Sequence, residues 1–323
     1  MTSRHDSPNI SVIVPSYNKP EYLPECLRSV QAQTFTDWEC IVVNDGSPRG
    51  EEIRAAVAAM NDPRFRLVEH EINRGLAAAR NTGVKAAKAE LVICLDEDDC
   101  ISPNCLEVLV RTIEQASVEI VVPYAHTMGD EKCIFKCEVP NLPESLLGGH
   151  LLGAGFMMQK QAWSAVGGWD ESSAIRARED VEWWIRVISQ GVRLTVVPQA
   201  LYQLRPRQAP EDYMRSLNWS CRERETSYRR YIIDKHRTLY NEFPEYKKLF
   251  LARGFELQAE WMVINGRLWS SRVLFWLAFL VSPSGSRLRK AIIGTIGETL
   301  GSVLIAVMRI SRSRALKHLA PHA

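Results

Sequence analysis

The chain has 323 residues, of which 46% are hydrophobic and 24% are charged, a composition ordinary for a globular protein that excludes a disordered one. The length suits one large domain with an appendage, or two domains. The net charge of +2 hides an asymmetry. Residues 1–204 carry 19 Lys and Arg against 28 Asp and Glu (−9), whereas residues 205–323 carry 21 against 10 (+11). An acidic first part and a basic second part indicate different partners.

The N-terminal residues and the cysteines both favour the cytosol. The first ten residues, MTSRHDSPNI, lack the apolar core of a secretory signal. Cys40 and Cys94 stand inside apolar runs, where a reduced thiol packs as a small hydrophobe, and the spacing of the eight cysteines predicts no disulfide framework. Cys133 and Cys137 lie close together, but no further ligands follow at zinc-site spacing, so we expect them to be structural.

Short β-branched runs alternate with helical patterns along the first part of the chain. Helices are predicted where apolar residues recur at i, i+3, i+4 and i+7 from Leu23 and from Leu106, and over the Ala-rich residues 76–89. The alternation is typical of βαβ units that build a parallel sheet, which binds ligands at the carboxyl ends of its strands. Five runs are predicted to be strands: residues 10–15, 39–43, 65–69, 91–95 and 118–122.

Polar residues follow three of these predicted strands. They are residues 16–18 after the first, 44–47 after the second and 96–99 after the fourth. Each group alone suits a turn or a helix end. Three groups at the same edge of one sheet favour a ligand site.

The third group is the most informative. The apolar run that begins at Leu91 ends abruptly in Asp96, Glu97, Asp98 and Asp99. Four adjacent acids repel one another, which indicates a neutralising charge from elsewhere, most simply a divalent cation. Oxygen ligands suit Mg²⁺ or Mn²⁺, ions that keep room for waters and nucleotide phosphates. The alternative is a solvated acidic turn that caps the next helix.

A second acidic position follows a looser, Gly- and Pro-rich stretch over residues 124–160. Asp180 precedes a predicted helix that ends at Gly191. The alternative for Asp180 is a helix N-cap, which is worth about 1 kcal/mol. The buried stripe of this helix is predicted to consist of Val181, Trp184, Ile185 and Ile188.

Four segments in order resemble the inverting glycosyltransferases of family 2, over about residues 10–204. The segment SVIVPSYNKPEYLPECLRSVQAQTFTDWECIVVNDGS resembles the family's nucleotide-binding half, and NRGLAAARNTG resembles its second segment. LDEDDCISP resembles the metal motif, and VGGWDE followed by RED and WWIR resembles the acceptor and base region. No single segment is specific to the family, but four segments in the expected order make the resemblance strong. The resemblance implies an α/β GT-A fold, with a Rossmann-like, mostly parallel sheet flanked by helices in residues 1–204, and a basic helical extension in residues 205–323.

The resemblance also implies a nucleotide site. Tyr17 would stack on or border the base, and Pro15 would shape the same wall. Asp45 matches the acid that hydrogen-bonds the base, usually uracil. Asn44 stands where the family often has Asp, which leaves the base less certain.

Further residues would hold the sugar nucleotide and a Mg²⁺ or Mn²⁺ ion. Asp96 would lie near the ribose or the metal, and Asp98 would be the direct metal ligand, with Asp99 in support. Asn73 and Arg80 would help to hold the nucleotide. A surface salt bridge is the alternative for Arg80.

The implied reaction moves a sugar from a nucleotide-diphosphate donor, UDP-linked by the resemblance, to a hydroxyl acceptor such as a lipid-linked or envelope glycan. Asp180 matches the family's general base, because a hydroxyl with a pKa far above 7 must lose its proton during attack. Trp169 and Glu179 would face the acceptor. Trp184 could line the same wall, but its place on the helix stripe favours the core.

The basic C-terminal part reads as helices outside the sheet. Val273–Val281 is continuously apolar but too short for a spanning helix, which needs about 20 residues. Cations before and after a second apolar helix suit peripheral attachment to an anionic membrane on its cytoplasmic face. A helical subdomain or an oligomer interface is the alternative. The apolar stripe of that second helix is Ile292, Ile293, Ile296, Leu300, Val303, Leu304 and Val307.

Two other functions compete with transfer. The first is an inactive scaffold of the same fold that binds a nucleotide-sugar or a glycan, although such a protein needs no base opposite the metal motif. The second is a metal-dependent phosphatase or nuclease, which leaves Tyr17 and Asp45 without a purpose. We expect no nucleic acid partner, because the basic part is too apolar for a phosphate groove.

Overall fold

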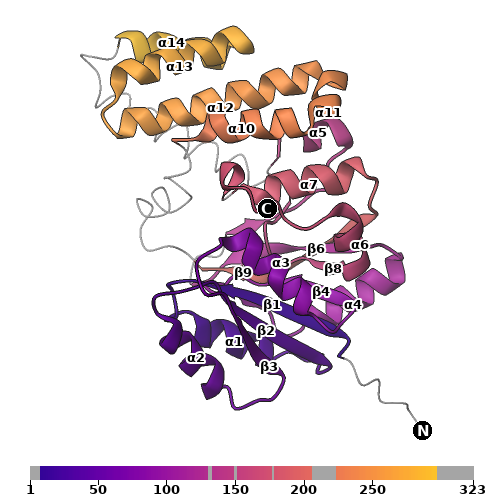
Figure 1. Ribbon diagram of the computed structural model, residues 1–323. Helices are drawn as coiled ribbons and strands as arrows, with labels where there is room; N and C mark the ends of the chain where they lie inside the picture. The colour runs from indigo at the N-terminus through magenta and orange to yellow at the C-terminus, as the bar shows by residue number, and fades with distance from the viewer. Residues whose placement is uncertain (1–7, 130–132, 149–150, 177, 206–222, 297–323) are drawn as a thin grey trace. The chain divides into compact units, whose positions relative to one another are not determined.

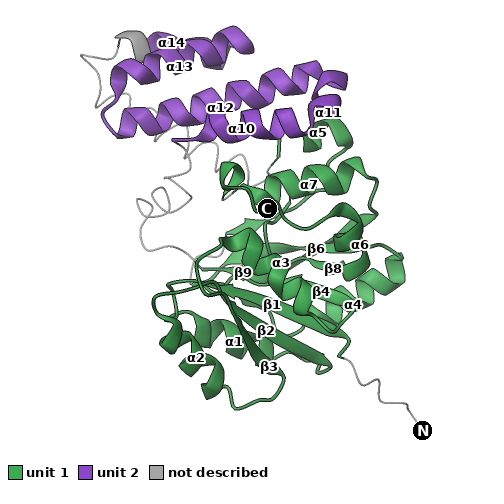
Figure 2. Cartoon of the chain, viewed as in Figure 1, with its two compact units in different colours: residues 1–213 green, residues 214–323 purple. Residues whose placement is uncertain are grey.

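The computed structural model describes residues 8–129, 133–148, 151–176, 178–205 and 223–296. It contains a sheet with helices on both faces and a separate group of helices (Figure 1). The chain forms two compact units, Met1–Tyr213 and Met214–Ala323 (Figure 2). The predicted boundary after Leu204 lies nine residues before this division, and residues 206–222 are outside the described part.

The first half of the sheet is parallel. Its strands β1 (Ile10–Ser16), β2 (Trp38–Asn44), β3 (Phe65–Glu69) and β4 (Leu91–Cys94) match four of the predicted runs to within one residue at each end. β1 pairs with β2 on one side and with β4 on the other, and β2 pairs with β3. Every residue of β1 and β2 is buried, which explains their continuous apolar sequence.

The second half of the sheet is mixed, and the sequence predicted little of it. β6 (Ile120–Thr127) begins two residues later and ends five residues later than the predicted run. β8 (Met157–Gln159) pairs antiparallel with both β4 and β6, and β9 (Leu194–Leu204) runs parallel to β6. Two-residue strands complete it: β5 (Cys100–Ile101) against β9 and β7 (Ile134–Phe135) against β6. The order is β3-β2-β1-β4-β8-β6-β9-β5, with β7 beside β6.

Alternate residues of the strands point to opposite faces of the sheet and pack in two hydrophobic cores. Val12 and Val14 face the core that is covered by α1 (Leu23–Gln31), α2 (Gly50–Ala59) and α4 (Cys105–Ala116). Ile13 faces the opposite core, which is covered by α3 (Leu76–Ala86), α6 (Lys160–Val166) and α7 (Glu179–Ser189). Gly83 lets α3 approach β1 closely, because a Cβ there would lie 2.1 Å from the Cγ2 atom of Ile13. Two short helices, α5 (Leu142–Ser145) and η1 (Ser173–Ile175), also belong to this unit.

The second unit consists of helices over its described residues 223–296, as predicted. They are α10 (Glu225–Lys235), α11 (Arg237–Glu242), α12 (Pro244–Ile264), α13 (Leu268–Val281) and α14 (Gly285–Ile296). The apolar run Val273–Val281 lies in α13, and the stripe predicted beyond Ile296 falls outside the described residues. Within the described part of the chain, no helix is both long and apolar enough to cross a membrane.

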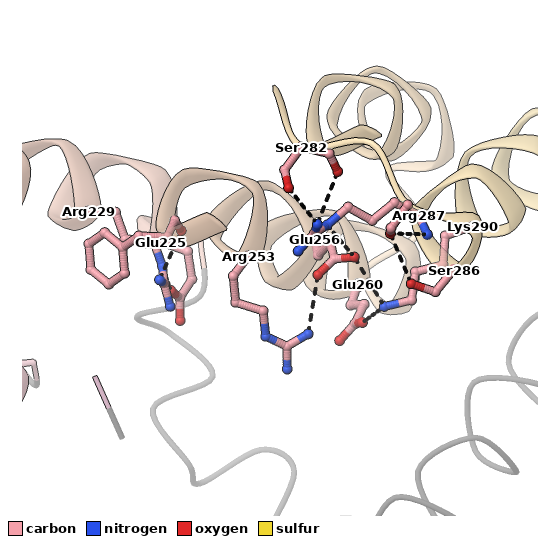
Figure 3. Close-up of polar contacts among 11 residues, drawn as sticks. Glu225, Arg229, Arg253, Glu256, Glu260, Ser282, Ser286, Arg287 and Lys290 are labelled. Atoms are coloured by element: carbon pink, nitrogen blue, oxygen red, sulfur yellow. Dashed lines mark hydrogen bonds and ion pairs between the residues drawn. The ribbon is translucent and has the colours of Figure 1, made fainter. Parts of the chain in front are cut away.

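Buried ion pairs join α14 to α12. Glu256 of α12 is 5% exposed and lies between Arg287 (3.3 Å) and Lys290 (3.7 Å) of α14 (Figure 3). Lys290 also pairs with Glu260 at 3.1 Å, and Nη1 of Arg287 donates to the hydroxyl of Ser282 at 2.9 Å. Because Glu256 would be costly to bury alone, these contacts fix the α13–α14 turn on α12.

Candidate active site

The predicted polar groups meet at one edge of the sheet. β1 lies between β2 and β4, so the strand order changes direction beside it, and the carboxyl ends of such strands form the usual ligand site of an open α/β sheet. Ser16 ends β1, Asn44 ends β2, and Asp96 follows β4 by two residues. The sequence prediction of a common edge is confirmed by these pairings.

Glu97 joins the ends of β1 and β4, a contact that the sequence did not predict. Its buried carboxylate accepts hydrogen bonds from the hydroxyl of Ser16 and from the backbone N–H of Tyr17 at 3.0 Å. Burial raises the pKa of Glu97, while these two hydrogen bonds oppose the rise. Glu97 therefore links the ends of β1 and β4, and its oxygens are engaged in these hydrogen bonds and not available to a metal.

Both acids of the Asp-x-Asp motif are paired with protein cations. The Nη2 atom of Arg80 lies 2.8 Å from Asp96, and the Nζ atom of Lys19 lies 2.6 Å from Asp98. These cations neutralise the repulsion that the sequence suggested a metal would neutralise. No group of three or more His, Cys, Asp or Glu side chains gathers around a metal position in the described residues.

Two carboxylates nevertheless fit the ion that the sequence predicts. Mg²⁺ and Mn²⁺ are held in nucleotide enzymes by one or two carboxylates together with substrate phosphates and waters. The side chains of Asp96 and Asp98 are 31% and 18% exposed, so both can be reached from solvent. Asp96 and Asp98 could therefore hold a divalent ion once a diphosphate supplies the remaining ligands.

Asp99, predicted to support the metal ligands, is buried and tied to the end of β9. It accepts from the hydroxyl of Tyr202 at 2.7 Å and from the backbone N–H of Arg205 at 2.9 Å. Burial raises the pKa of Asp99 to about 7, and the neighbouring charge of Asp96 adds to the rise. The side chain of Arg205 also donates to the carbonyl oxygen of Asp98 at 2.8 Å, which fixes the backbone of the motif.

Asp45 is buried and already saturated with hydrogen bonds. Its carboxylate contacts Nδ1 of His70 at 2.7 Å and accepts from the Asn73 side chain at 2.9 Å and from the N–H groups of Arg74 and Gly75. Asp45 therefore holds the loop between β3 and α3 in place, and Asn73 is part of this loop. Contacts from Asp45 and Asn73 to a base stay predictions.

Tyr17 and Pro15 lie at the same edge as these acids. Pro15 is buried within β1, opposite Val43 of β2. Tyr17 is 44% exposed, which leaves its ring available to border a flat ligand. Their contact with a nucleotide base stays a prediction.

Arg80 connects the metal motif with the helix that carries the predicted base. Its side chain is 3% exposed, and its guanidinium group lies 2.8 Å from Asp96 on one side and 3.5 Å from Glu179 on the other. Burial raises the pKa of Glu179, while the charge of Arg80 opposes the rise. The surface salt bridge that was the alternative for Arg80 is therefore wrong, because this arginine is buried between two acids from distant segments.

Asp180 is the second residue of α7 and follows Glu179. The residue at the N-cap position is Arg178, so the predicted N-cap alternative for Asp180 is wrong. Its side chain is partly exposed, and its Oδ2 atom lies 3.0 Å from where a Cβ on Gly153 would stand. A glycine at 153 thus leaves room beside the carboxylate.

The tryptophans of this region form a core rather than an open wall. Trp169, predicted to face the acceptor, is 2% exposed and stacks on Trp183 with ring centroids 5.3 Å apart. Its backbone N–H and carbonyl are held by the side chain of Asn81. Trp184 is also buried, as the helix stripe favoured, but the stripe was partly wrong: Trp183 and Val187 are buried, whereas Val181 and Ile188 are partly exposed. Because Trp169 is buried in this aromatic core, its packing does not favour the predicted contact with the acceptor.

Two family models match the chain. One, described as glycosyl transferase family 2, matches residues 11–136, and the other, glycosyl transferase family group 2, matches residues 91–310, more than half of the chain. The chain belongs to glycosyltransferase family 2. The family predicted from the four sequence segments is therefore confirmed.

Similar glycosyltransferases are found in bacteria. EpsJ of Bacillus subtilis is 43% identical over 115 residues, which cover 35% of this chain and 33% of EpsJ. EpsE of the same organism is 28% identical over 206 residues, which cover 62% of this chain and 74% of EpsE. WcaA of Escherichia coli, named as a colanic acid biosynthesis glycosyltransferase, is 34% identical over 110 residues, or 34% of this chain and 39% of WcaA. The match thus spans about a third of the length of EpsJ and WcaA.

Solved structures share the fold. Residues 1–349 of Staphylococcus aureus TarS in complex with UDP are 19% identical, with a TM-score of 0.59 over 93% of this chain and 91% of that one. The mannosyltransferase PcManGT of Pyrobaculum calidifontis, in complex with GDP-Man and Mn²⁺, is 18% identical, with a TM-score of 0.54 over 91% and 88%. At this identity the likeness concerns the fold, and it confirms the predicted α/β GT-A fold with its C-terminal helical region.

Proposed function

We propose that this protein is an inverting glycosyltransferase that moves a sugar from a UDP-linked donor to a hydroxyl group of a glycan or a lipid-linked acceptor. The observation that carries the proposal is the double ion pair of Arg80. One guanidinium group contacts both Asp96, on the donor side, and Glu179, the neighbour of Asp180. A donor-side carboxylate, Asp96, and the residue that precedes Asp180 therefore share one buried cation.

The donor side uses the edge formed by β1, β2 and β4. Tyr17 and Pro15 border the base, and the loop held by Asp45 presents Asn73 to the nucleotide. Asp96 and Asp98 would hold a divalent ion, which would supply positive charge next to the diphosphate leaving group. The UDP and UDP-GlcNAc complexes of TarS support a uridine nucleotide, and the Mn²⁺ complex of PcManGT supports a metal.

The acceptor side uses Asp180. Its carboxylate takes the proton of the attacking hydroxyl, because an alkoxide does not form unaided at neutral pH. Arg80 and Glu179 set its position from the donor side of the site. Attack on the face opposite the leaving group inverts the anomeric centre in one step, without a covalent intermediate on the protein.

Donor binding and product analysis test the proposal. With Mn²⁺, UDP-sugars should raise the melting temperature, and chelation by EDTA should remove the effect. With an acceptor, transferred sugar should have the opposite anomeric configuration to the donor, as read by NMR of the product. Retained configuration would contradict the inverting mechanism, and binding without transfer to any acceptor would favour the inactive scaffold. Release of free sugar alone would favour a hydrolase.

We also propose that the second unit attaches to an anionic membrane surface. Trp269, Val273 and Leu280 lie on one side of α13 at helical spacing and are 75%, 42% and 68% exposed. Ile292 and Ile293 of α14 are also exposed. The net charge of +11 over residues 205–323 complements anionic lipid, which is why we favour a membrane over a second protein.

Vesicle flotation tests this attachment. Trp269→Ser combined with Leu280→Ser should lower the affinity for vesicles rich in phosphatidylglycerol by about 10² or more, because each apolar side chain contributes about 1.5–3 kcal/mol when buried and two are removed. Val139→Ser is the control, because Val139 is also exposed but lies in the first unit. This variant should bind the vesicles like the wild type. Equal flotation of all variants, or flotation on neutral vesicles alone, would rule the attachment out.

A further inference from the structure

The cation beside Asp98 is held in place by the end of β1. Lys19 follows Asn18, whose φ of 63° turns the chain sharply after the strand. The preceding residues are fastened on two sides, since Tyr17 donates its backbone N–H to Glu97 and Asn18 donates to the hydroxyl of Ser47 at 3.1 Å. These contacts fix the backbone next to Lys19, and from there its ammonium group lies 2.6 Å from Asp98.

The two cations on the Asp-x-Asp motif differ in their freedom to move. Arg80 has only 3% of its side chain exposed and is paired on two sides, so moving it out of the site would leave the buried carboxylate of Glu179 without a counter-charge. Lys19 has 42% of its side chain exposed and, among the described residues, forms an ion pair with one carboxylate, that of Asp98. Its flexible four-carbon stem can carry the ammonium group to another anion nearby. Of these two cations, Lys19 is therefore the one that can move away from its carboxylate.

We propose that Lys19 competes with the divalent ion for Asp98, and that the ammonium group, once displaced, contacts the diphosphate of the donor. This inference deepens the proposed function and rests on it. Without nucleotide, the ion must displace the Lys19 ammonium group from Asp98, its ion-pair partner among the described residues. With nucleotide, the diphosphate supplies negative charge both to the ion and to Lys19. Lys19 thereby couples binding of the ion to binding of the donor, so each strengthens the other.

Calorimetry of the full chain with Lys19→Met tests this coupling. Titrated with Mn²⁺ alone, the variant should bind the ion about two- to fivefold more tightly than the wild type, which is the range that a partly exposed ion pair can oppose. Titrated with UDP at saturating Mn²⁺, the same variant should bind about tenfold more weakly, because a charged contact to phosphate is lost. Two affinity changes of opposite sign are the signature of Lys19 acting on both ligands.

Two matched variants separate this role from general effects of charge. Lys85→Met removes an exposed lysine of α3 and should leave both affinities unchanged, while Lys19→Arg keeps the cation and should stay near the wild type. Weakening of both affinities in Lys19→Met, or unchanged Mn²⁺ affinity, would overturn the inference. If the wild type binds UDP equally with and without Mn²⁺, the metal-dependent function fails instead, whereas the titration with Mn²⁺ alone still decides the competition at Asp98.

Discussion

Asp180→Asn should reduce transfer by a factor of about 10²–10⁴ while leaving metal-dependent UDP binding nearly intact. An amide cannot accept the proton of the acceptor hydroxyl, and positioned general bases contribute about this factor. The substitution keeps the shape of the side chain beside Gly153. It removes a favourable charge from the first turn of α7, which costs about 0.3–1 kcal/mol of stability. The measurements are kcat on the sugar acceptor and calorimetry with UDP and Mn²⁺.

Asp62→Asn provides a matched control for that exchange. Asp62 is also partly exposed, but it lies before β3, where hydrogen bonds from Arg64 lower its pKa to about 2. Its amide variant should lose some stability and keep full turnover. If Asp180→Asn behaves in the same way, Asp180 has only a structural role and another group must take the proton.

Arg80→Met should cause the largest combined loss of stability and activity. It leaves Glu179 without its cation and removes the ion pair of Asp96. Breaking a buried pair by removing one partner typically costs about 3–5 kcal/mol. Turnover should fall with it even at temperatures where the variant is folded, because Asp96 and the start of α7 lose their common anchor. Denaturant unfolding and kcat measure the two effects.

The loss in Arg80→Met should depend on pH. Burial already raises the pKa of Glu179, and removal of Arg80 takes away the charge that opposes the rise. A carboxyl group with a raised pKa binds more protons in the folded than in the unfolded state, so stability falls as the pH rises above the ordinary glutamate value of 4.5. The variant should therefore be less destabilised near pH 5 than near pH 8. Adding Glu179→Gln should remove that dependence.

Arg64→Met is the control for the loss of an arginine. Its partner Asp62 and its own side chain are partly exposed, so the expected cost is about 0–1 kcal/mol. A similarly small cost for Arg80→Met would show that Asp96 and Glu179 are satisfied without Arg80. The structural argument for a single joined site would then be lost.

The sequence predicted the first half of the fold well and the second half poorly. β1 to β4 are buried on both faces or lie beside such strands, and their continuous apolar runs stand out from the amphipathic helices between them. β5, β7 and β8 contain two or three residues each, too few for any periodic pattern. Because these short strands are formed by pairing with β4, β6 and β9, no local signal marks them.

The positions of the acids at the strand ends could be predicted from the sequence, because a buried apolar run that stops at charged residues is a local pattern: Asp45 follows β2, and Asp96, Asp98 and Asp99 follow β4. The groups that neutralise those charges became visible only in the folded structure. Lys19 lies 79 residues from Asp98, and Arg80 lies 99 residues from Glu179. Such pairs are created when the chain brings distant segments to one sheet edge, and pairing inside the protein is the physical alternative to an ion from solution.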